Sequence, residues 1–322
     1  MYSGNKAISI LAKEIDKFDH HESSHWKYLN KNIKYDKNII SGFSGFGDAS
    51  RRFYGIQNFL HFLFQSPFRK QGHTYKNFKQ YDLISRRIAL KQNRSYDINC
   101  LRQTLFLSYL NQKNNCELKN IIKTEPVVCI IGDGFGYMAS LLIKLNITKK
   151  IYLVNLSKVL LIDLIYLKKV FGENKFNNCV NLVQNSDDLQ NIEKKSLGAN
   201  EFQIIALEAK KFHLLEQCNF NFVMNIHSMQ EMNYNIIDKY FNYIRKSKYK
   251  DKILFYCCNR VKKTLFDGEE LIFDDYPWKK NDKIVFDETC PNWNQRTYMS
   301  KAPFYVNYDG KHKHRLVFLS RS

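Results

Sequence analysis

Short apolar runs rich in β-branched residues alternate with helical patterns in the second part of the chain. VVCII at 127–131 is followed by the helical pattern YMASLLIKL, and IYLVN at 151–155 is followed by SKVLLIDLIYLKKVF. Three more apolar runs lie at 202–207, 220–225 and 252–258. Apolar residues at consecutive positions are typical of parallel strands covered by helices on both faces. Because crossovers between such strands are right-handed, the pattern predicts a doubly wound α/β sheet.

The first part of the chain has apolar residues spaced three and four apart instead. RRFYGIQNFLHFLF at 51–64 and YDLISRRIALKQ at 81–92 both predict helices. Toward the C-terminus the pattern turns to short strands and aromatic loops, and HRLVFLS closes the chain. We therefore predict a mainly helical N-terminal region over 1–122 and an α/β domain over 123–322. Within that domain we expect a loop segment that contacts substrate at about 266–310.

Positive charge is abundant and unevenly placed. The chain has 322 residues and a formal net charge of +19. Between Arg51 and Arg102 there are eleven Lys and Arg residues and only two Asp. Such a segment attracts anions, which include nucleic acid, phosphorylated sugars and acidic membrane faces. For the chain as a whole, a basic surface with no particular anionic partner is the alternative.

The eight cysteines show no C-x-x-C pair. Cys129, Cys257 and Cys258 lie inside apolar, strand-like runs, where a free thiol acts as a small hydrophobic group. This use of cysteine indicates a reducing compartment. No apolar run approaches the ~20 residues of a membrane span, so we expect a cytoplasmic protein without a transmembrane segment. The sequence leaves open whether identical chains assemble.

Three glycines, Gly132, Gly134 and Gly136, directly follow the VVCII run. At a sharp strand-to-helix turn, glycine allows a positive φ and lets a ligand approach the backbone. Dinucleotide sites use G-x-G-x-x-G, but Tyr137 stands where the third glycine would fall. The spacing G-x-G-x-G instead resembles motif I of class I S-adenosylmethionine-dependent methyltransferases, which implies S-adenosylmethionine as cofactor. A glycine-rich turn without a ligand remains the alternative.

Two positions depart from that resemblance. Methyltransferases of this class usually have an acid two residues before the first glycine, where this chain has Ile130. They usually have a second acid at the end of the next strand, to bind ribose hydroxyls, where this chain has Asn155. An asparagine can still bind a diol, but without the help of a charge. Asp133, between the glycines, is our candidate to compensate.

A dense group of polar residues, NIHSMQEM, follows the 220–225 run. It places Asn225, His227, Ser228, Gln230 and Glu231 at the carboxyl end of a strand, where doubly wound sheets bind ligands. The alternative is a loop and helix cap, in which a serine and the glutamate three residues later form a capping box.

Taken together, these motifs resemble the sugar O-methyltransferases of bacterial surface-polysaccharide clusters. The matching pieces, in chain order, are SSHW, RRFYGIQNFL, VVCIIGDGFGYMASLL, NLSKVLLIDLIYLKKVF, NIHSMQEM, FYCCNR, DDYPW and KHRLVFL. The resemblance implies a Rossmann-like class I methyltransferase fold and methyl transfer from S-adenosylmethionine to a sugar hydroxyl. Given the basic segment, the acceptor would be an anionic saccharide that is nucleotide-linked, phosphorylated or lipid-linked.

The resemblance also implies roles for individual residues. Glu231, which matches the family motif, is the preferred base, and His227 is the second candidate. The cofactor contacts would be Gly132, Asp133, Gly134, Gly136, Asn155 and Asn225. The candidate substrate contacts are Arg51, Arg52, Tyr276, Trp278, His314 and Arg315. Ordinary core or loop packing is the alternative for Tyr276 and Trp278, and a solvated strand edge is the alternative for His314 and Arg315. No metal ligands are assigned, and a requirement for a divalent metal stays open.

Two rival functions remain. A nucleic-acid methyltransferase would explain the charge, but the N-P-P-Y type of motif is replaced by N-I-H-S, so no stable nucleic-acid partner is expected. A binding protein that has lost its cofactor would explain Ile130 and Asn155.

Overall fold

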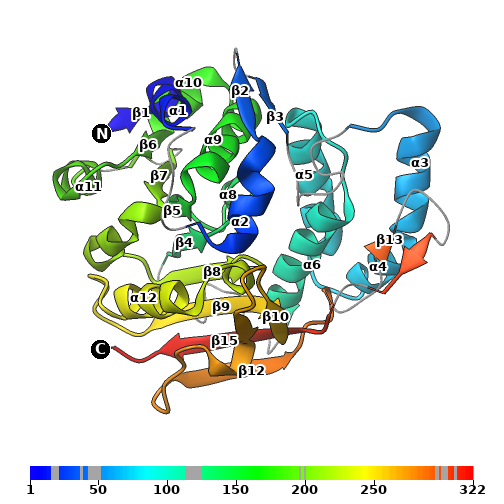
Figure 1. Cartoon of the computed structure of the whole chain (residues 1–322). Helices are drawn as coiled ribbons and strands as arrows, with labels where there is room; N and C mark the ends of the chain where they lie inside the picture. Colours follow the sequence, from blue (N-terminus) through cyan, green and yellow to red (C-terminus); the bar gives the residue numbers. More distant parts are fainter. Residues whose placement is uncertain are drawn as a thin grey trace.

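The computed structural model describes residues 1–15, 22–36, 39–42, 52–112, 125–195, 197–198, 201–293, 297–298, 304–307 and 310–321. In this part of the chain a nine-stranded sheet forms the centre (Figure 1). Its strands, in spatial order, are β1 (Tyr2–Ser3), β6 (Val180–Leu182), β7 (Gln203–Glu208), β5 (Lys150–Asn155), β4 (Val127–Ile131), β8 (Phe222–Ile226), β9 (Ile253–Arg260), β15 (His312–Leu319) and β12 (Lys283–Thr289).

The strand order confirms the predicted doubly wound, Rossmann-like α/β fold. Strands β7, β5, β4, β8 and β9 are parallel, and their spatial order is the 3-2-1-4-5 order of a doubly wound sheet. β15 is antiparallel to both β9 and β12, so β12 again runs parallel to β9. The order reverses between β4 and β8, and ligands bind at such a switch point.

Helices cover both faces of this sheet, as the consecutive apolar residues predict. One face packs Ile130 and Leu153 against α8 (Tyr137–Lys144) and α9 (Ser157–Phe171). The other packs Ile131 and Val154 in one cluster with residues of α12 (Tyr234–Arg245). Two short helices, α10 (Glu173–Cys179) and α11 (Ser186–Glu193), flank β6 along the chain. Ile130 is thus a core residue of β4, where an ionised acid without a partner would be costly.

The N-terminal region divides into two parts. β1 and α1 (Gly4–Lys13) lie with the sheet domain, where β1 pairs with β6 and α1 packs on α9. The remainder contains α2 (Ser24–Leu29), the hairpin β2 (Lys34–Asp36) and β3 (Ile39–Ser41), α3 (Gly55–Phe64), α4 (Ser66–Gly72), α5 (Phe78–Lys91) and α6 (Ile98–Gln112). Of these, α5 and α6 pack together and α5 contacts α8, while α3 lies on the outer side (Figure 1).

After β9 the chain forms two short hairpins, β10 (Lys262–Thr264) with β11 (Glu270–Ile272), and β13 (Thr297–Tyr298) with β14 (Tyr305–Val306). Within the described ranges, no helix is both long and apolar enough to cross a membrane.

Candidate cofactor and catalytic site

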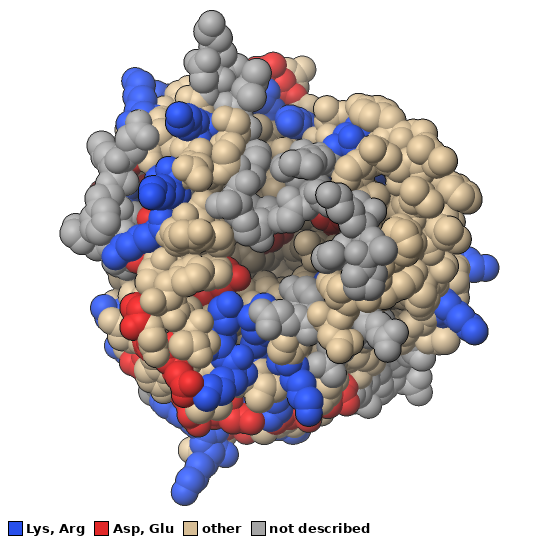
Figure 2. All heavy atoms as spheres, turned by 45° about the vertical axis from the view of Figure 1, so that its right-hand side comes forward, with Lys and Arg blue, Asp and Glu red and all other residues tan. Residues whose placement is uncertain are grey.

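A cavity of about 360 Å³ lies at the carboxyl ends of β4, β5 and β8. The sheet register brings these ends together, because Ile131 pairs with Val154 on one side and with Asn225 on the other. The wall contains Gly132, Asp133, Gly134, Asn155, His227, Ser228 and Glu231, together with residues of the N-terminal region such as His25 and Arg94. The face in Figure 2 is hollowed near its centre, and Lys and Arg side chains gather below the hollow.

The glycine turn fits tightly against the loop after β8. Gly132 has a φ of 75°, and its N–H donates to the carbonyl of Val154 at 2.9 Å. A Cβ on Gly132 would lie 2.3 Å from both Oγ and Cβ of Ser228. Gly134 has a φ of 72° and also lines the cavity. Gly132 therefore lets the end of β4 pack closely on Ser228, and both glycines have a φ in the left-handed region that favours glycine.

Gly136 has a different role, because it is not part of the cavity wall. Its φ is 56°, and a Cβ there would lie 2.6 Å from Cγ of Leu167 on α9. Its N–H donates to Oδ1 of Asp163 at 2.9 Å. Gly136 thus allows α8 and α9 to pack closely, and its contact with a cofactor stays a prediction.

Asp163 is a buried acid that the sequence analysis missed. Its Oδ2 accepts a hydrogen bond from Nδ2 of Asn155 at 2.9 Å, so it holds the side chain of Asn155 at the end of β5. Burial, with the nearby Asp133 carboxyl, raises its pKa well above the ordinary value. A lone acid inside the apolar helix SKVLLIDLIYLKKVF was the available clue.

Asp133 caps the helix that follows the glycine turn. Its carboxylate accepts from the N–H groups of Met138 and Ala139, both at 2.8 Å, while the residue also lines the cavity. Burial raises its pKa to about 7, and the hydrogen bonds from the helix oppose that rise. Whether Asp133 also contacts a cofactor remains a prediction.

Asn225 lies behind the wall. It is fully buried, and its Nδ2 donates to the carbonyl of Ile131 and to Oγ of Ser228, both at 2.9 Å. Its Oδ1 accepts from the N–H of Met229 at 3.1 Å and from Nδ2 of Asn259 at 2.9 Å. Both donors and both lone pairs of the amide are engaged. Asn225 thus fixes the ends of β4, β8 and β9 relative to one another, and its contact with a cofactor stays a prediction.

His227 lies at the cavity in a stack of rings. Its φ of 64° is unusual for a residue with a side chain. The ring lies parallel to His312 at 4.4 Å and contacts Trp293 at 3.6 Å between centroids. Burial, followed by the charges of His312, Arg102 and Arg260, lowers its pKa well below the ordinary value. The imidazole is therefore neutral at neutral pH, and this environment resists its protonation.

Glu231 lines the cavity beside His25 from the N-terminal region. Nε2 of His25 lies 3.5 Å from Oε1 of Glu231, and both side chains are only partly exposed. The ring of His25 stacks on Phe266 at 5.4 Å, and the hydroxyl of Ser23 donates to the backbone carbonyl of Glu231. The structure thus pairs the preferred base with a histidine to which the sequence analysis assigned no role, although SSHW contains it.

The two aromatic residues that the sequence offers as substrate contacts, Tyr276 and Trp278, lie in or against the core. Tyr276 is buried in the apolar core of one sheet face, where it packs against Phe273 and Phe241. Trp278 packs on the same cluster and donates Nε1–H to the carbonyl of Phe273 at 2.9 Å. Neither side chain lines the cavity. Packing, which the sequence left as the alternative, explains both.

His314 and Arg315, the other candidate substrate contacts near the C-terminus, bond to side chains within the protein. They lie on the central part of β15, whose neighbours β9 and β12 supply their partners. Nδ1 of His314 lies 3.1 Å from the hydroxyl of Tyr256, and Nε2 lies 3.2 Å from Glu288. Arg315 donates to Asp287 at 2.6 Å and to Asp274 at 2.9 Å. These contacts belong to the sheet and lie away from the cavity.

Of the two predicted phosphate-binding arginines, Arg51 lies outside the described residues. Arg52 donates to Oδ1 of Asn93 at 2.8 Å and does not line the cavity. Other cations do line it, namely Arg94, Arg260 and Lys263. The guanidinium of Arg94 lies 3.7 Å from the ring centre of Phe135 in the glycine turn. The basic segment thus reaches the site, but through Arg94.

Among the described residues no group of three His, Cys, Asp or Glu side chains is placed to hold a metal ion.

Comparison with known proteins does not assign this chain to a family. No family model matches the chain, and no curated protein matches it. Among solved structures, an S-adenosylmethionine-dependent methyltransferase from Archaeoglobus fulgidus is 12% identical, with 67% of this chain and 94% of that chain covered and a TM-score of 0.35. The methyltransferase domain of bacterial CtHen1-CN is 12% identical, with 69% and 100% covered and a TM-score of 0.35.

Proposed function

We propose that this chain is an S-adenosylmethionine-dependent O-methyltransferase that acts on a hydroxyl of an anionic saccharide. The observation that carries the proposal is the cavity itself. It brings a glycine turn at the switch point of a doubly wound sheet together with a partly buried carboxylate–histidine pair. The sheet adds support, since an antiparallel strand inserted beside the fifth parallel strand is the arrangement of class I methyltransferases.

The wall of the cavity suits the cofactor. Gly132 and Gly134 give close access to the backbone, and Asn155 stands at the end of β5, where the ribose would lie. Leu156, Val159 and Ala209 provide an apolar part of the wall for the adenine ring. When bound, S-adenosylmethionine supplies an electrophilic methyl group on a positively charged sulfur. Asn155 is held by Asp163, so its orientation is set before the cofactor binds.

Glu231 is the base in this proposal, and His25 is a positioning residue. With S-adenosylmethionine held by the wall described above, methyl transfer to the acceptor hydroxyl would give S-adenosylhomocysteine and release the hydroxyl proton. The carboxylate of Glu231 would accept that proton. His25, 3.5 Å away, holds that carboxylate toward the cavity. His227 is less suited to the role, because its burial near Arg102 and Arg260 disfavours the protonated ring.

The remaining wall supports the proposal of an anionic acceptor. Arg94, Arg260 and Lys263 favour an anionic group, and guanidinium groups suit phosphate. Trp26 also lines the cavity and offers an aromatic face for a sugar ring, in place of Tyr276 and Trp278.

The experiment is methyl transfer from labelled S-adenosylmethionine to a panel of nucleotide sugars, sugar phosphates and the matching neutral sugars. We expect label in the anionic acceptors, little in the neutral ones, and about 10²- to 10⁴-fold less transfer by Glu231→Gln. Transfer to RNA in place of any sugar would replace this proposal by the nucleic-acid alternative. Unchanged transfer by Glu231→Gln would remove Glu231 from the role of base.

A further inference from the structure

Helix α3 carries an apolar stripe that faces outward. The stripe follows helical spacings of three and four and consists of Ile56, Phe59, Leu60 and Leu63. Their exposed fractions are 74%, 62%, 39% and 49%. The helix contains no Lys, Arg, Asp or Glu, and none of its residues is buried. A surface helix normally turns such a stripe toward the core. In Figure 2 the area to the right of the hollow is broad and almost without charged side chains.

The apolar stripe points outward because residues on the opposite side of α3 contact the rest of the protein. His61 stacks on Phe53 at 4.3 Å, and its Nδ1 lies 2.8 Å from the hydroxyl of Tyr298. The ring of Phe62 lies 5.0 Å from the guanidinium of Arg69 and 4.7 Å from that of Arg86. These contacts use the polar and aromatic side of the helix, so the apolar stripe is left for another surface.

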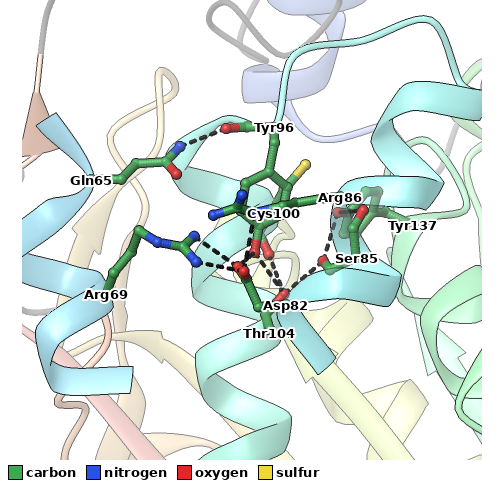
Figure 3. A network of polar contacts seen from close by, with 9 residues as sticks. All are labelled: Gln65, Arg69, Asp82, Ser85, Arg86, Tyr96, Cys100, Thr104 and Tyr137. Atoms are coloured by element: carbon green, nitrogen blue, oxygen red, sulfur yellow. Dashed lines mark hydrogen bonds and ion pairs between the residues drawn. The ribbon is translucent and has the colours of Figure 1, made fainter. Parts of the chain in front are cut away.

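The charges around α3 are of one sign. From Gly55 to Lys91 the sequence contains a single acid, Asp82. This acid is buried and accepts from Arg69 at 2.7 Å, while Nε of Arg86 lies 3.0 Å from it (Figure 3). The exposed charged residues of α4, of the turn after it and of the body of α5 are all basic, namely Lys70, Lys76, Lys79 and Arg87, whereas Lys91 at the end of α5 lies against α9. An apolar stripe whose following helices expose basic residues and no acid fits a negatively charged, partly apolar partner.

We propose that the stripe of α3 and these basic residues form a docking face for an anionic lipid bilayer. Apolar side chains would enter the boundary between headgroups and acyl chains, and the lysines and arginines would lie over acidic headgroups. A nucleic acid would use the charge but would leave the aliphatic stripe in water. A second copy of the chain would place like charges opposite each other. The proposal depends on this surface alone and not on the reaction in the cavity.

A polar network connects the docking face to the cavity side of the fold. Asp82 also accepts from the hydroxyl of Tyr96 at 3.0 Å, and Tyr96 lies 3.1 Å from Oγ1 of Thr104 (Figure 3). Thr104 bonds to Ser85 at 2.6 Å, and Ser85 bonds to the hydroxyl of Tyr137 at 2.7 Å, at the start of α8. The protein would therefore bind the bilayer with its glycine turn in a fixed orientation relative to the membrane surface.

The test is flotation of the full chain with vesicles of phosphatidylcholine alone and with roughly 30 mol% phosphatidylserine, an anionic lipid. We expect binding to the anionic vesicles, about tenfold weaker binding to the neutral ones, and loss of binding at about 0.5 M NaCl, where surface charges are screened. Phe59→Ser/Leu63→Ser should reduce binding by about tenfold or more. Ile284→Ser, which removes an equally exposed side chain from β12, is the matched control and should bind as the native chain does.

Several outcomes would overturn the proposal. The first is a native chain that floats with neither kind of vesicle. The second is a Phe59→Ser/Leu63→Ser variant that binds as well as the native chain. If the native chain is a dimer without lipid and this variant is a monomer, the stripe is an interface between copies. Release from vesicles by RNA, with the variant still binding that RNA, would assign the basic residues to nucleic acid. Circular dichroism of both variants shows whether they are folded.

Discussion

Replacing Gly132 by alanine tests how closely the end of β4 packs on the loop after β8 beside the cavity. An alanine with a φ of 75° costs about 1–2 kcal/mol of conformational strain. The added Cβ would lie 2.3 Å from both Cβ and Oγ of Ser228, so rotation of the serine hydroxyl cannot relieve the overlap. The strands must then move apart, which we expect to cost a further ~1–3 kcal/mol.

We therefore expect Gly132→Ala to lower the free energy of unfolding by about 2–5 kcal/mol, measured by urea denaturation. Gly268→Ala is the matched control, because Gly268 has a φ of +91° and open space where a Cβ would lie. That variant should lose only the cost of the backbone conformation, about 1–2 kcal/mol.

A double mutant separates the overlap from the backbone strain. Ser228→Gly alone removes the bonds from Asn225 at 2.9 Å and to Ile131 at 3.1 Å, a loss of about 1–3 kcal/mol. In Gly132→Ala/Ser228→Gly the overlap is gone, so the loss should be about 1–3 kcal/mol smaller than the sum of the two single losses. If the two losses simply add, Gly132 and Ser228 do not pack against each other as described.

Three further predictions concern the site and its support. His25→Gln should reduce methyl transfer less than Glu231→Gln does, and it should shift the pH dependence of kcat. An unchanged pH profile would show that the pairing of His25 with Glu231 has no part in catalysis. Burial raises the pKa of Asp133 from 3.8 to about 7, so the folded chain holds a proton that the unfolded chain releases between these values. This group therefore lowers the free energy of unfolding as pH rises from about 4 to about 7, by at most ~1.4 kcal/mol per pH unit. In urea denaturation across that range, Asp133→Asn should lose stability less steeply with pH than the native chain does. Identical slopes for the two chains would contradict the burial of Asp133. Asn225→Ala should lower the free energy of unfolding by about 2–4 kcal/mol, because four hydrogen bonds are lost in the core, and a loss below about 1 kcal/mol would show that they are not made.

The sequence predicted the central sheet well where strands are buried on both faces. The run VVCII coincides with β4 and the run SKVLLIDLIYLKKVF coincides with α9, because consecutive apolar residues and a long helical period leave little ambiguity. The short strands β1 and β6 and the edge strand β12 were not predicted. They have two, three and seven residues and gain their structure by pairing with neighbours distant in sequence.

The site was predicted less completely, because its parts come from distant segments. Gly132, Gly134, Asn155, His227 and Glu231 do reach one cavity, as expected for residues at the ends of neighbouring strands. Their individual roles remain predictions. His25 joins them from a helix about 200 residues away in the chain, and no local pattern shows that.

The aromatic and basic residues that the sequence offers as substrate contacts have partners in the structure that their local sequence does not show. Tyr276 and Trp278 have the composition of a sugar platform, but apolar rings are equally suited to a core. His314 and Arg315 look like an anion site until antiparallel pairing places Glu288 and Asp287 beside them. Pairing partners across a sheet are not encoded in the local sequence.

The most direct measurement is a calorimetric titration of the chain with S-adenosylhomocysteine. The native chain should bind with a dissociation constant of about micromolar order. Gly134→Val, at the cavity wall, should abolish binding, whereas Gly172→Val, at a φ of +79° in open space outside the cavity, should not. A folded native chain that does not bind, or a Gly134→Val variant that binds equally well, would contradict the assignment of this cavity to the cofactor.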